Sequence, residues 1–578
     1  MKEKNLEKIR HSLSHLLAQA VKEKFPKVKL GIGPVIENGF YYDFDFSSTE
    51  PLREGDLAEL EDIMRKNIDK NLTFVGKTIT ENEAREIFSK EPYKLELIEN
   101  LKKKDQSLMV YESGNFIDLC SGPHVDMSHQ IDKESFHLER IAGAYWLGDE
   151  KNKMLTRIYG VAFADKNKLE EYKERKEEAL KRDHRKLGKD LDLFCFSEIV
   201  GAGLPLFTPN GTMIKDILQK HIEEICRQYG FEKVSTPHLA KIDLYELSGH
   251  AKKFGDELFR VSSPAGHNFV LKPVQCPHHT QIYASKPRSY RDLPIRYMES
   301  EKQYRAEKTG EVGGLNRVYA ITVEDGHTFC RPDQIKEEVT KMINIIKDFY
   351  TSLGLWEDHW VSLSVRDYDH PEKYIGEPAD WDECEKVLEE ISNDLKLEAK
   401  RCEGEAALYG PKLDFMFRDA LGKEIQIPTV QLDFATPKKF NLIYTDKDGS
   451  EKNPIMIHRA ILGSYERFMA LIIEHFAGAF PTWLSPIQVT ILPISDNFID
   501  EALKVKDKLK SAGIRVDILS DGETLGKRLR QAKMKKVPYI VILGEKEIRE
   551  NNLQIEKRDG QSRKMTTAEL IDCILDDN

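Results

Sequence analysis

Residues 294–331, PIRYMESEKQYRAEKTGEVGGLNRVYAITVEDGHTFCR, decide the fold of this chain. Two stretches with the composition of strands, 294–304 and 315–328, flank a loop that contains Lys308-Thr309-Gly310. Glycine-rich polar residues between two such stretches are typical of turns. The sequence therefore predicts an antiparallel hairpin with a long tip.

The second predicted strand carries polar side chains on one face. Side chains alternate along a strand, so Arg317, Val323, Asp325 and His327 are expected to point the same way. A cation, a carboxylate and an imidazole are costly to bury together, and a bound ligand would account for them. The alternative is a solvated outer face of the sheet.

Composition limits the classes of protein to consider. A length of 578 residues and a hydrophobic content of 40% suit several ordinary domains. No apolar stretch reaches membrane-spanning length, and the N-terminus lacks the apolar core of a signal peptide. Eight cysteines without a CxxC pair favour a reducing compartment, so we expect a cytoplasmic protein with no membrane contact. The net charge of −11 does not exclude a local basic surface for nucleic acid.

The N-terminal region begins with a predicted amphipathic helix, 5–24, whose apolar residues follow helical spacing. His11 and His15 lie four residues apart on nearly the opposite side of that helix. Asn38-Gly39 between apolar stretches predicts a hairpin, and a helical insert is expected at about 56–105. The segments 142–149 and 153–163 are expected to form the closing strands.

Two histidine-containing patterns in this region suggest a site. HSLSH gives an HxxxH pattern with His11 and His15, and Cys120 and His124 give a CxxxH pattern. Thiolate and imidazole are suitable donors for a four-ligand zinc site. The same side chains could equally line a metal-free hydrolytic pocket, and the pattern alone leaves both interpretations open.

Two basic segments are candidates for contact with RNA. The charged helix predicted at 165–190 ends with Lys181, Arg182, Arg185, Lys186 and Lys189, although such a helix is often only a solvated linker. From about residue 485 strands and helices alternate, which predicts a small α/β domain with a mainly parallel sheet. Its second helix, GKRLRQAKMKK, predicts a phosphate-facing surface through Lys527, Arg528, Arg530, Lys533, Lys535 and Lys536.

Three motifs resemble those of class II aminoacyl-tRNA synthetases. Arg305-Ala306-Glu307 resembles motif 2, 229–237 resembles motif 1, and Gly463 followed by Glu466-Arg467 resembles motif 3. HSLSH with DLCSGPH is similar to the editing domain that threonyl- and alanyl-tRNA synthetases share. The C-terminal domain resembles the anticodon-binding domain of the threonyl, prolyl, histidyl and glycyl enzymes.

The chain is therefore identified as a member of the bacterial threonyl-tRNA synthetase family. The resemblance implies an α+β multidomain protein, with a class II antiparallel sheet core and flanking helices, an α+β editing domain and an α/β anticodon-binding domain. We expect an editing domain at 1–164, a linker helix at 165–190, a catalytic domain at 191–484 and the anticodon-binding domain at 485–578.

The resemblance also implies ligands and partners. The expected reaction consumes ATP, with Mg²⁺, and L-threonine to form an adenylate, from which tRNA(Thr) takes the amino acid. Cys276, His327 and His458 lack local zinc-finger spacing, but the resemblance groups them on one catalytic-site Zn²⁺. Three protein ligands leave a metal position open, which threonine can fill through its amino and hydroxyl groups. Valine lacks the hydroxyl, and a site that demands a polar group discriminates strongly against such an isostere.

The remaining roles follow from the same resemblance. Catalytic residues would be Arg305, Arg467, His250 and Lys412. ATP would contact Arg305, Glu307, Arg317, Gln431 and Arg467, and threonine would contact Asp325, Tyr409 and Gln426. Editing of seryl-tRNA, metal-free in the threonyl branch, would use His11, His15, Tyr42, Lys94, Asp118, Cys120 and His124. The anticodon would meet Lys536 and Glu547, a homodimer would form through the catalytic domain, and His278 and His279 are expected at the surface or behind the metal ligands.

Three departures from the family pattern stand out. The sequence is expected to open on the editing domain, where family members usually have a ubiquitin-like domain first. Val323 stands where bacterial relatives usually have a glutamine near the substrate amino group, and Asp521-Gly522 stands where relatives place an asparagine. Two alternatives remain from other classes of protein. One is an RNA-binding regulator that has lost the chemistry, and the other is a metallohydrolase centred on the HxxxH and CxxxH patterns.

Overall fold

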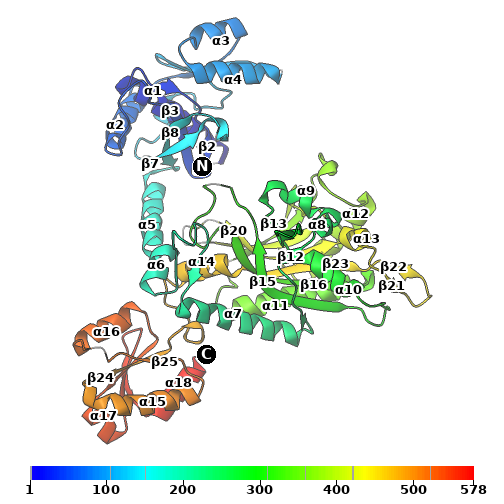
Figure 1. The fold of residues 1–578 in the computed structure, drawn as a ribbon. Helices are drawn as coiled ribbons and strands as arrows, with labels where there is room; N and C mark the ends of the chain where they lie inside the picture. The colour runs from blue at the N-terminus through cyan, green and yellow to red at the C-terminus, as the bar shows by residue number, and fades with distance from the viewer. Residues whose placement is uncertain are drawn as a thin grey trace. The chain divides into compact units, whose positions relative to one another are not determined.

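The computed structural model describes residues 3–577 except 105, 150, 309, 358, 419–421, 423 and 521. Thr309 of the expected hairpin tip and Asp521 lie outside the described residues. The chain divides into two compact units, Met1–Glu177 and Glu178–Asn578. Figure 1 shows the first unit in blue to cyan. No helix within the described ranges is long and apolar enough to cross a bilayer.

The first unit is built on a five-stranded sheet. Its order is β1-β3-β8-β7, with β2 paired to β3, and every pair is antiparallel. The first helix packs its predicted apolar stripe against this sheet, and Leu13, Leu16 and Leu17 are fully buried. The bounds are α1 Glu3–Lys24, β1 Lys29–Leu30, β2 Val35–Ile36, β3 Gly39–Asp45, β7 Phe136–Tyr145 and β8 Met154–Ala162.

The insert expected to be helical contains a strand and joins a second sheet. Phe74–Ile79 pairs antiparallel with the next strand, and Thr80 then caps a new helix through a capping box. Three helices are present in 56–105 as expected, but the strand was missed because cross-strand pairing outweighed the local helical pattern there. The bounds are α2 Asp56–Asp69, β4 Phe74–Ile79, α3 Glu81–Ile87, α4 Pro92–Lys103, β5 Leu108–Ser113 and β6 Phe116–Leu119.

The charged segment 165–190 forms two helices, α5 (Lys166–Arg182) and α6 (His184–Asp190), where one was expected. Asp183 separates them because its backbone is non-helical and its carboxylate accepts a hydrogen bond from Arg185 N at 2.7 Å. An aspartate in this position starts a new helix.

An eight-stranded sheet forms the core of the second unit, drawn in green and yellow in Figure 1. Its order is β11-β15-β16-β23-β20-β19-β17-β18, antiparallel except for the pairs β11/β15 and β17/β18 at its two ends. Helices α7 and α11 contact its strands and each other. The strand bounds are β11 Glu232–Lys233, β15 Ile295–Tyr304, β16 Ala320–Cys330, β17 His359–Val365, β18 Lys400–Glu403, β19 Lys412–Arg418, β20 Glu424–Asp433 and β23 Ile455–Ser464.

Helices and short strands surround this sheet. The helices are α7 Pro209–Gln228, α8 Ile242–Ser248, α9 His250–Phe254, α10 Cys276–Ala284, α11 Ile335–Ser352, α12 Pro378–Asp394, α13 Ala435–Lys439 and α14 Tyr465–His475. The strands are β9 Phe194–Cys195, β10 Leu206–Phe207, β12 Leu239–Ala240, β13 Arg260–Ser262, β14 Asn268–Leu271, β21 Tyr444–Thr445 and β22 Glu451–Lys452.

The predicted hairpin is present as β15 and β16, but its second strand starts later than expected. Arg317 precedes β16 and pairs with Gly313 in a small turn, so it does not share the strand face of Asp325 and His327. Gly314, which the sequence pattern placed in the loop, has a φ of +54°, and the loop continues past the expected strand start at residue 315 to Ala320.

The C-terminal module has a five-stranded sheet of order β25-β24-β26-β27-β28. The three predicted strands are parallel, while β27 and β28 extend the sheet antiparallel and were not anticipated. The bounds are β24 Val489–Pro493, α15 Ile499–Ser511, β25 Val516–Ile518, α16 Leu525–Met534, β26 Tyr539–Leu543, α17 Glu545–Glu550, β27 Leu553–Lys557, β28 Ser562–Met565 and α18 Thr567–Asp576.

Candidate functional site

The central sheet brings Cys276, His327 and His458 together. His327 on β16 and His458 on β23 are directly paired residues of neighbouring strands, and Cys276 begins α10. Their Sγ and ring nitrogen atoms all lie within 4.8 Å of one another. All three residues are buried, and His327 Nε2 lies 3.1 Å from His458 Nδ1.

The chemistry of this cluster fits a zinc ion. One thiolate and two imidazoles are preferred zinc donors, and a three-ligand site leaves a position for substrate. Burial raises the pKa of the Cys276 thiol well above its ordinary value, so a nearby cation is needed to favour the thiolate. His458 Nε2 lies 2.9 Å from Asp433 Oδ2, and Asp433 is itself held by the Ala435 and Thr436 amides. That carboxylate accepts the Nε2 hydrogen and leaves the lone pair of Nδ1 for the metal.

Polar side chains from the sheet and from the loop before β19 lie beside the cluster. The Tyr409 ring stacks on His458 with 4.8 Å between centroids, and its hydroxyl donates to Gln431 Oε1 at 2.8 Å. Asp325 lies two residues before His327, with 17% of its side chain exposed, and burial raises its pKa to about 7. Val323 is buried on the same strand.

A hydrogen-bonded group centred on Asp414 lies on β19 and β20. Lys412 Nζ lies 2.7 Å from one carboxylate oxygen of Asp414, and Gln426 Nε2 donates to the other at 2.6 Å. Lys412 pairs across the strands with Gln431. The expected ATP residue Gln431 and threonine residue Gln426 thus lie on the same strand, β20, five residues apart.

His250 lies beside the metal cluster at the start of α9. Its Nε2 is 4.0 Å from Cys276 Sγ, and its Nδ1 is 2.9 Å from the Ser248 hydroxyl. Burial lowers the pKa of His250 to about 4, so the ring is neutral at physiological pH. A neutral imidazole can accept a proton from a reacting hydroxyl group.

Two arginines flank this region. Arg305 follows β15, and in the described part of the chain its side chain makes one hydrogen bond, to Pro273 O at 3.4 Å. Arg467 lies in the first turn of α14, which Ser464 caps. Burial lowers the pKa of both guanidinium groups, for Arg467 with help from the charge of Arg317. Such cationic groups are suited to binding an added anion.

Arg317 already has carboxylate partners. Its guanidinium lies 2.7 Å from Glu307 and 3.1 Å from Glu311, and half of the side chain is exposed. The motif 2 carboxylate Glu307 is therefore engaged within the loop. An incoming nucleotide that contacts either residue would have to compete with this ion pair.

The first unit assembles the second predicted cluster. His11 Nε2 and His124 Nε2 lie 3.2 and 3.3 Å from Cys120 Sγ, and His15 completes a group whose ligand atoms all lie within 4.8 Å. Burial lowers the pKa of all three imidazoles and raises the pKa of Cys120 to about 11. The group therefore offers neutral nitrogen bases, two of them on buried and one on a half-buried histidine.

Asp118 is a buried carboxylate that contacts three residues of the expected editing site. Lys94 Nζ lies 2.5 Å from one carboxylate oxygen, Tyr42 donates to the other at 2.6 Å, and His15 Nε2 lies 3.8 Å away. Lys94 and Tyr42 are fully buried. Burial, and then the charge of Asp118, raise the pKa of Tyr42 well above its ordinary value.

The C-terminal module differs in one respect from the expected basic surface. Arg528 is buried and donates to the carbonyl groups of Pro493 and Leu519 at 2.8 Å, so it holds the module together and is not a phosphate-facing side chain. The sequence of α16 alone does not show that the Arg528 side chain points inward. Glu547 accepts a hydrogen bond from Gly544 N at 3.0 Å at the start of α17.

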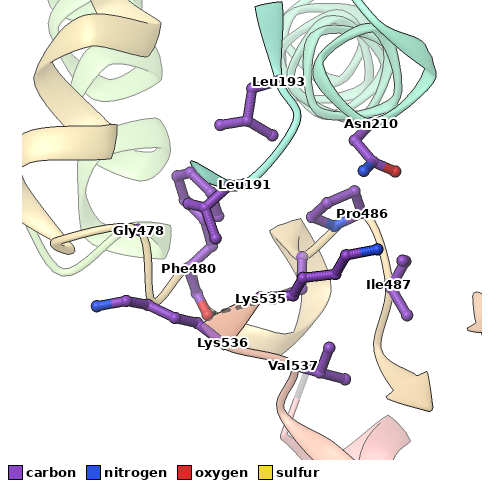
Figure 2. A pocket seen from close by; sticks show the side chains of 11 residues that line it. Leu191, Leu193, Asn210, Gly478, Phe480, Pro486, Ile487, Lys535, Lys536 and Val537 are labelled. Atoms are coloured by element: carbon purple, nitrogen blue, oxygen red, sulfur yellow. Dashed lines mark hydrogen bonds between the residues drawn. The ribbon is translucent and has the colours of Figure 1, made fainter. Parts of the chain in front are cut away.

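Lys535 and Lys536 line a small pocket at the end of α16. Figure 2 shows them near Leu191, Phe480 and Val537. The cavity volume of about 20 Å³ accommodates roughly one water molecule and excludes a nucleobase. Lys536 has a φ of +53°.

Several residues close to the sites were not assigned from the sequence. Asp433 and Glu299 are buried; Asp433 is hydrogen-bonded to His458, and Glu299 to His279. His278 and His279 were expected at the surface or behind the metal ligands; both are buried, and His279 lies behind His327. The three-residue spacing of Cys276 and His279 on one helix was an available signal.

Comparisons with known proteins agree with this geometry. Residues 259–476 match the family model described as tRNA synthetase class II core domain (G, H, P, S and T). Residues 488–577 match the anticodon binding domain, and residues 108–159 match the threonyl and alanyl tRNA synthetase second additional domain.

Curated relatives match nearly the whole chain. A threonine–tRNA ligase of Gloeobacter violaceus is 45% identical over 97% of this chain and 90% of its own. The corresponding protein of Porphyromonas gingivalis is 44% identical over 98% of this chain and 87% of its own.

Solved structures give the same result. The RNA binding domain of threonyl-tRNA synthetase from Cryptosporidium parvum is 34% identical, has a TM-score of 0.64, and covers 68% of this chain and 98% of that one. A putative threonyl-tRNA synthetase from Aeropyrum pernix is 27% identical with a TM-score of 0.61, over 68% of this chain and 94% of that one. The chain therefore belongs to the threonine–tRNA ligase family of class II aminoacyl-tRNA synthetases.

Proposed function

We propose that this chain joins L-threonine to tRNA(Thr) at the expense of ATP and selects threonine at a zinc site formed by Cys276, His327 and His458. The observation that carries the proposal is that these three donors converge beside the nucleotide-binding motifs. The two histidines are 131 residues apart in the sequence. The bound zinc would supply a Lewis acid with a position open to the amino and hydroxyl groups of the substrate.

Protein side chains complete the selection of threonine. Asp325 is placed to accept a hydrogen bond from the substrate hydroxyl, and Tyr409, held by Gln431, orients the amino group. Gln426, which donates a hydrogen bond to Asp414, would also contact threonine. Valine offers no hydroxyl and leaves Asp325 unpaired, which a buried polar site disfavours strongly.

Adenylate formation depends on the two arginines. Arg305 would hold the α-phosphate and Arg467 the γ-phosphate of ATP, with Mg²⁺ on the nucleotide and Arg317, Glu307, Gln431 and Lys412 completing the pocket. The threonine carboxylate attacks the α-phosphorus and pyrophosphate leaves. Fixed cations stabilise the charge that develops on the phosphate oxygens.

Transfer to tRNA follows from the position of His250. Its neutral ring would take the proton of the ribose hydroxyl as that oxygen attacks the adenylate carbonyl and AMP leaves. The Ser248 hydroxyl bound to Nδ1 orients the ring.

The first unit would hydrolyse seryl-tRNA without a metal. His11, His15, Cys120 and His124 surround the ester and the attacking water, and Lys94 and Tyr42 hold Asp118 in place. Neutral imidazoles are suited to removing a proton from water. A zinc ion on the same four residues is the alternative for this pocket.

The remaining assignments concern the whole chain. We place editing in 1–164, a linker in 165–190, catalysis in 191–484 and anticodon binding in 485–578, with Lys536 and Glu547 toward the anticodon. The catalytic domain would form a homodimer. Eight free cysteines favour a reducing compartment and thus a cytoplasmic location.

An ATP–pyrophosphate exchange assay with threonine, serine and valine tests the function. Zinc-loaded protein is expected to exchange with threonine, weakly with serine and not with valine. Equal exchange with threonine and valine would remove the hydroxyl-dependent selection from the proposal. Absence of exchange with all three amino acids would favour an RNA-binding protein without the chemistry.

A further inference from the structure

His279 and Glu299 form a buried hydrogen-bonded chain behind His327. His279 lies three residues after Cys276 on α10, so both side chains project from one face of the helix. His279 Nδ1 lies 2.7 Å from His327 Nδ1, and His279 Nε2 lies 3.3 Å from Glu299 Oε2. Both imidazoles are fully buried and Glu299 is 3% exposed.

The surroundings of Glu299 fix it as a hydrogen-bond acceptor. Thr236 donates to it from both its amide and its hydroxyl, the latter at 2.9 Å. The fully buried Lys272 lies 3.7 Å from Oε2 and also donates to Thr236. A buried carboxylate with a cation and several donors around it is held in the ionised form.

The direction of the chain follows from counting protons. A carboxylate can only accept, so His279 donates from Nε2, and the Nδ1 of its neutral ring accepts. The facing Nδ1 of His327 must then donate. This leaves the lone pair of His327 on Nε2, the atom that lies 3.1 Å from His458 Nδ1.

We propose that His279, held by Glu299, is a positioning residue that fixes His327 in the Nδ1-protonated tautomer and so presents Nε2 to the metal. Asp433 fixes the other tautomer in His458: it accepts the hydrogen of Nε2 and leaves the lone pair of Nδ1 for the metal. A reversed chain would place the His327 hydrogen on Nε2, opposite the His458 lone pair, and remove His327 from the ligand set. The inference rests on the zinc site proposed above.

The test measures zinc affinity of the full-length protein by competition with a chromophoric chelator. We expect His279→Phe, which keeps an aromatic ring but neither nitrogen, to weaken Zn²⁺ binding by about 10- to 100-fold, the range typical of outer partners of metal ligands. His279→Asn retains an acceptor near Nδ1 and should recover part of that loss. His278→Asn is the matched control, because the adjacent His278 has no hydrogen-bond partner among the described residues and should leave zinc affinity unchanged.

The absorption spectrum of Co²⁺-substituted protein gives a second readout that packing alone would not move. Loss of His327 from the ligand set is expected to change the cobalt bands in His279→Phe and not in His278→Asn. Glu299→Gln replaces His279→Phe if the latter does not fold, with the same expected direction.

The outcomes separate this inference from the proposed function. A parent protein that binds no stoichiometric zinc would overturn the zinc site and the inference with it. A parent that binds zinc, with His279→Phe and Glu299→Gln within about twofold of it and unchanged cobalt spectra, would overturn the role of His279 alone.

Discussion

Gly326 of β16 faces Arg459 of β23, and a methyl group at Gly326 would lie 2.7 Å from the guanidinium carbon. Arg459 is fully buried and its Nη1 donates to both carboxylate oxygens of Glu324 at 2.7 and 2.8 Å. Glu324 precedes Asp325, and Arg459 follows His458. This ion pair therefore lies on the opposite face of the strands from the metal ligands and fixes the register that brings His327 opposite His458.

Gly326→Ala is expected to lower the free energy of unfolding by about 1–3 kcal/mol, because the added methyl group has no space beside a buried ion pair. Zinc affinity should fall with it, since a shifted Arg459 displaces His458. Denaturant unfolding and chelator competition measure the two effects. Gly313→Ala is the control, because nothing lies within 4 Å of an added Cβ there. A Gly326→Ala protein as stable as this control would contradict the steric argument.

Cys276→Ala is expected to abolish stoichiometric zinc binding and threonine-dependent exchange, because two imidazoles alone do not hold the ion against competition. Cys195→Ala removes an exposed thiol that is not part of the ligand set and serves as the control. Zinc content and the exchange rate are measured on the same preparations. Retention of threonine activation by zinc-free Cys276→Ala would exclude the metal from the mechanism.

His11→Ala is expected to leave aminoacylation intact while seryl-tRNA accumulates, because the variant loses one nitrogen base of the editing pocket. Deacylation of preformed seryl-tRNA is the direct measurement. His129→Ala is a matched control in the same unit, where the histidine is exposed and bonded to Asn71. Equal deacylation by His11→Ala and its parent would assign the pocket another role. A second zinc per chain, lost in His11→Ala, would support the four-ligand metal alternative.

Local patterns in the sequence were enough to predict the hairpin, the amphipathic α1 and the parallel strands of the C-terminal module. These local patterns gave wrong predictions where contacts between distant segments determine the structure. Phe74–Ile79 becomes a strand because β5 is available beside it, and Arg317 lies outside β16 because Gly314 turns the chain first. The family resemblance, and no spacing rule, grouped Cys276 with His327 and His458. The strand register pairs the two histidines, and the start of α10 places Cys276 beside them. Arg528 was misassigned because a basic helix does not reveal which cation bonds inward.

The stability of the first unit is expected to depend on acid through Asp45. Burial acts to raise the pKa of this carboxyl, but hydrogen bonds from Lys153, Ser47 and Tyr93 outweigh it and hold the pKa below its ordinary value. The folded pKa is thus lower than the unfolded one, so the stabilisation is present above the ordinary carboxyl pKa of about 4 and is lost as pH falls toward the folded pKa.

Asp45→Asn should therefore reduce the stability of β3 at pH 7 by about 1–3 kcal/mol, the usual contribution of hydrogen bonds to a charged group, and flatten its dependence on pH below about 5. Hydrogen exchange of β3 amides at several pH values measures this. Asp69→Asn, at an exposed ion pair with Lys133, is the control. An unchanged acid dependence in Asp45→Asn would show that other carboxylates carry it.

Arg467→Lys tests the phosphate clamp while keeping the charge. A guanidinium binds two phosphate oxygens through a planar fork, whereas an ammonium acts as a point charge on a shorter reach. Loss of such a preorganised donor is expected to slow threonine-dependent exchange by about 10²- to 10³-fold. Zinc content and the free energy of unfolding should stay near the parent values, because the Arg467 side chain forms no ion pair with a described residue. The Ser464 hydroxyl caps α14 by accepting from the backbone amide of residue 467, which the substitution keeps.

Arg291→Lys, at an exposed arginine bonded to Tyr290, is the matched substitution and should leave exchange unchanged.

Rates measured over a range of ATP concentrations separate two effects of Arg467→Lys. A γ-phosphate contact made equally in ground and transition states raises the KM for ATP alone, whereas one that strengthens as pyrophosphate leaves lowers kcat. Burial disfavours the charged guanidinium of Arg467 in the free enzyme, and the bound phosphate compensates for this. The phosphate gains negative charge as the bond to the α-phosphorus breaks, so the contact with Arg467 strengthens in the transition state. We therefore expect Arg467→Lys to lower kcat more than it raises the KM for ATP. Exchange by Arg467→Lys equal to that of Arg291→Lys would show that the motif 3 arginine does not bind the nucleotide.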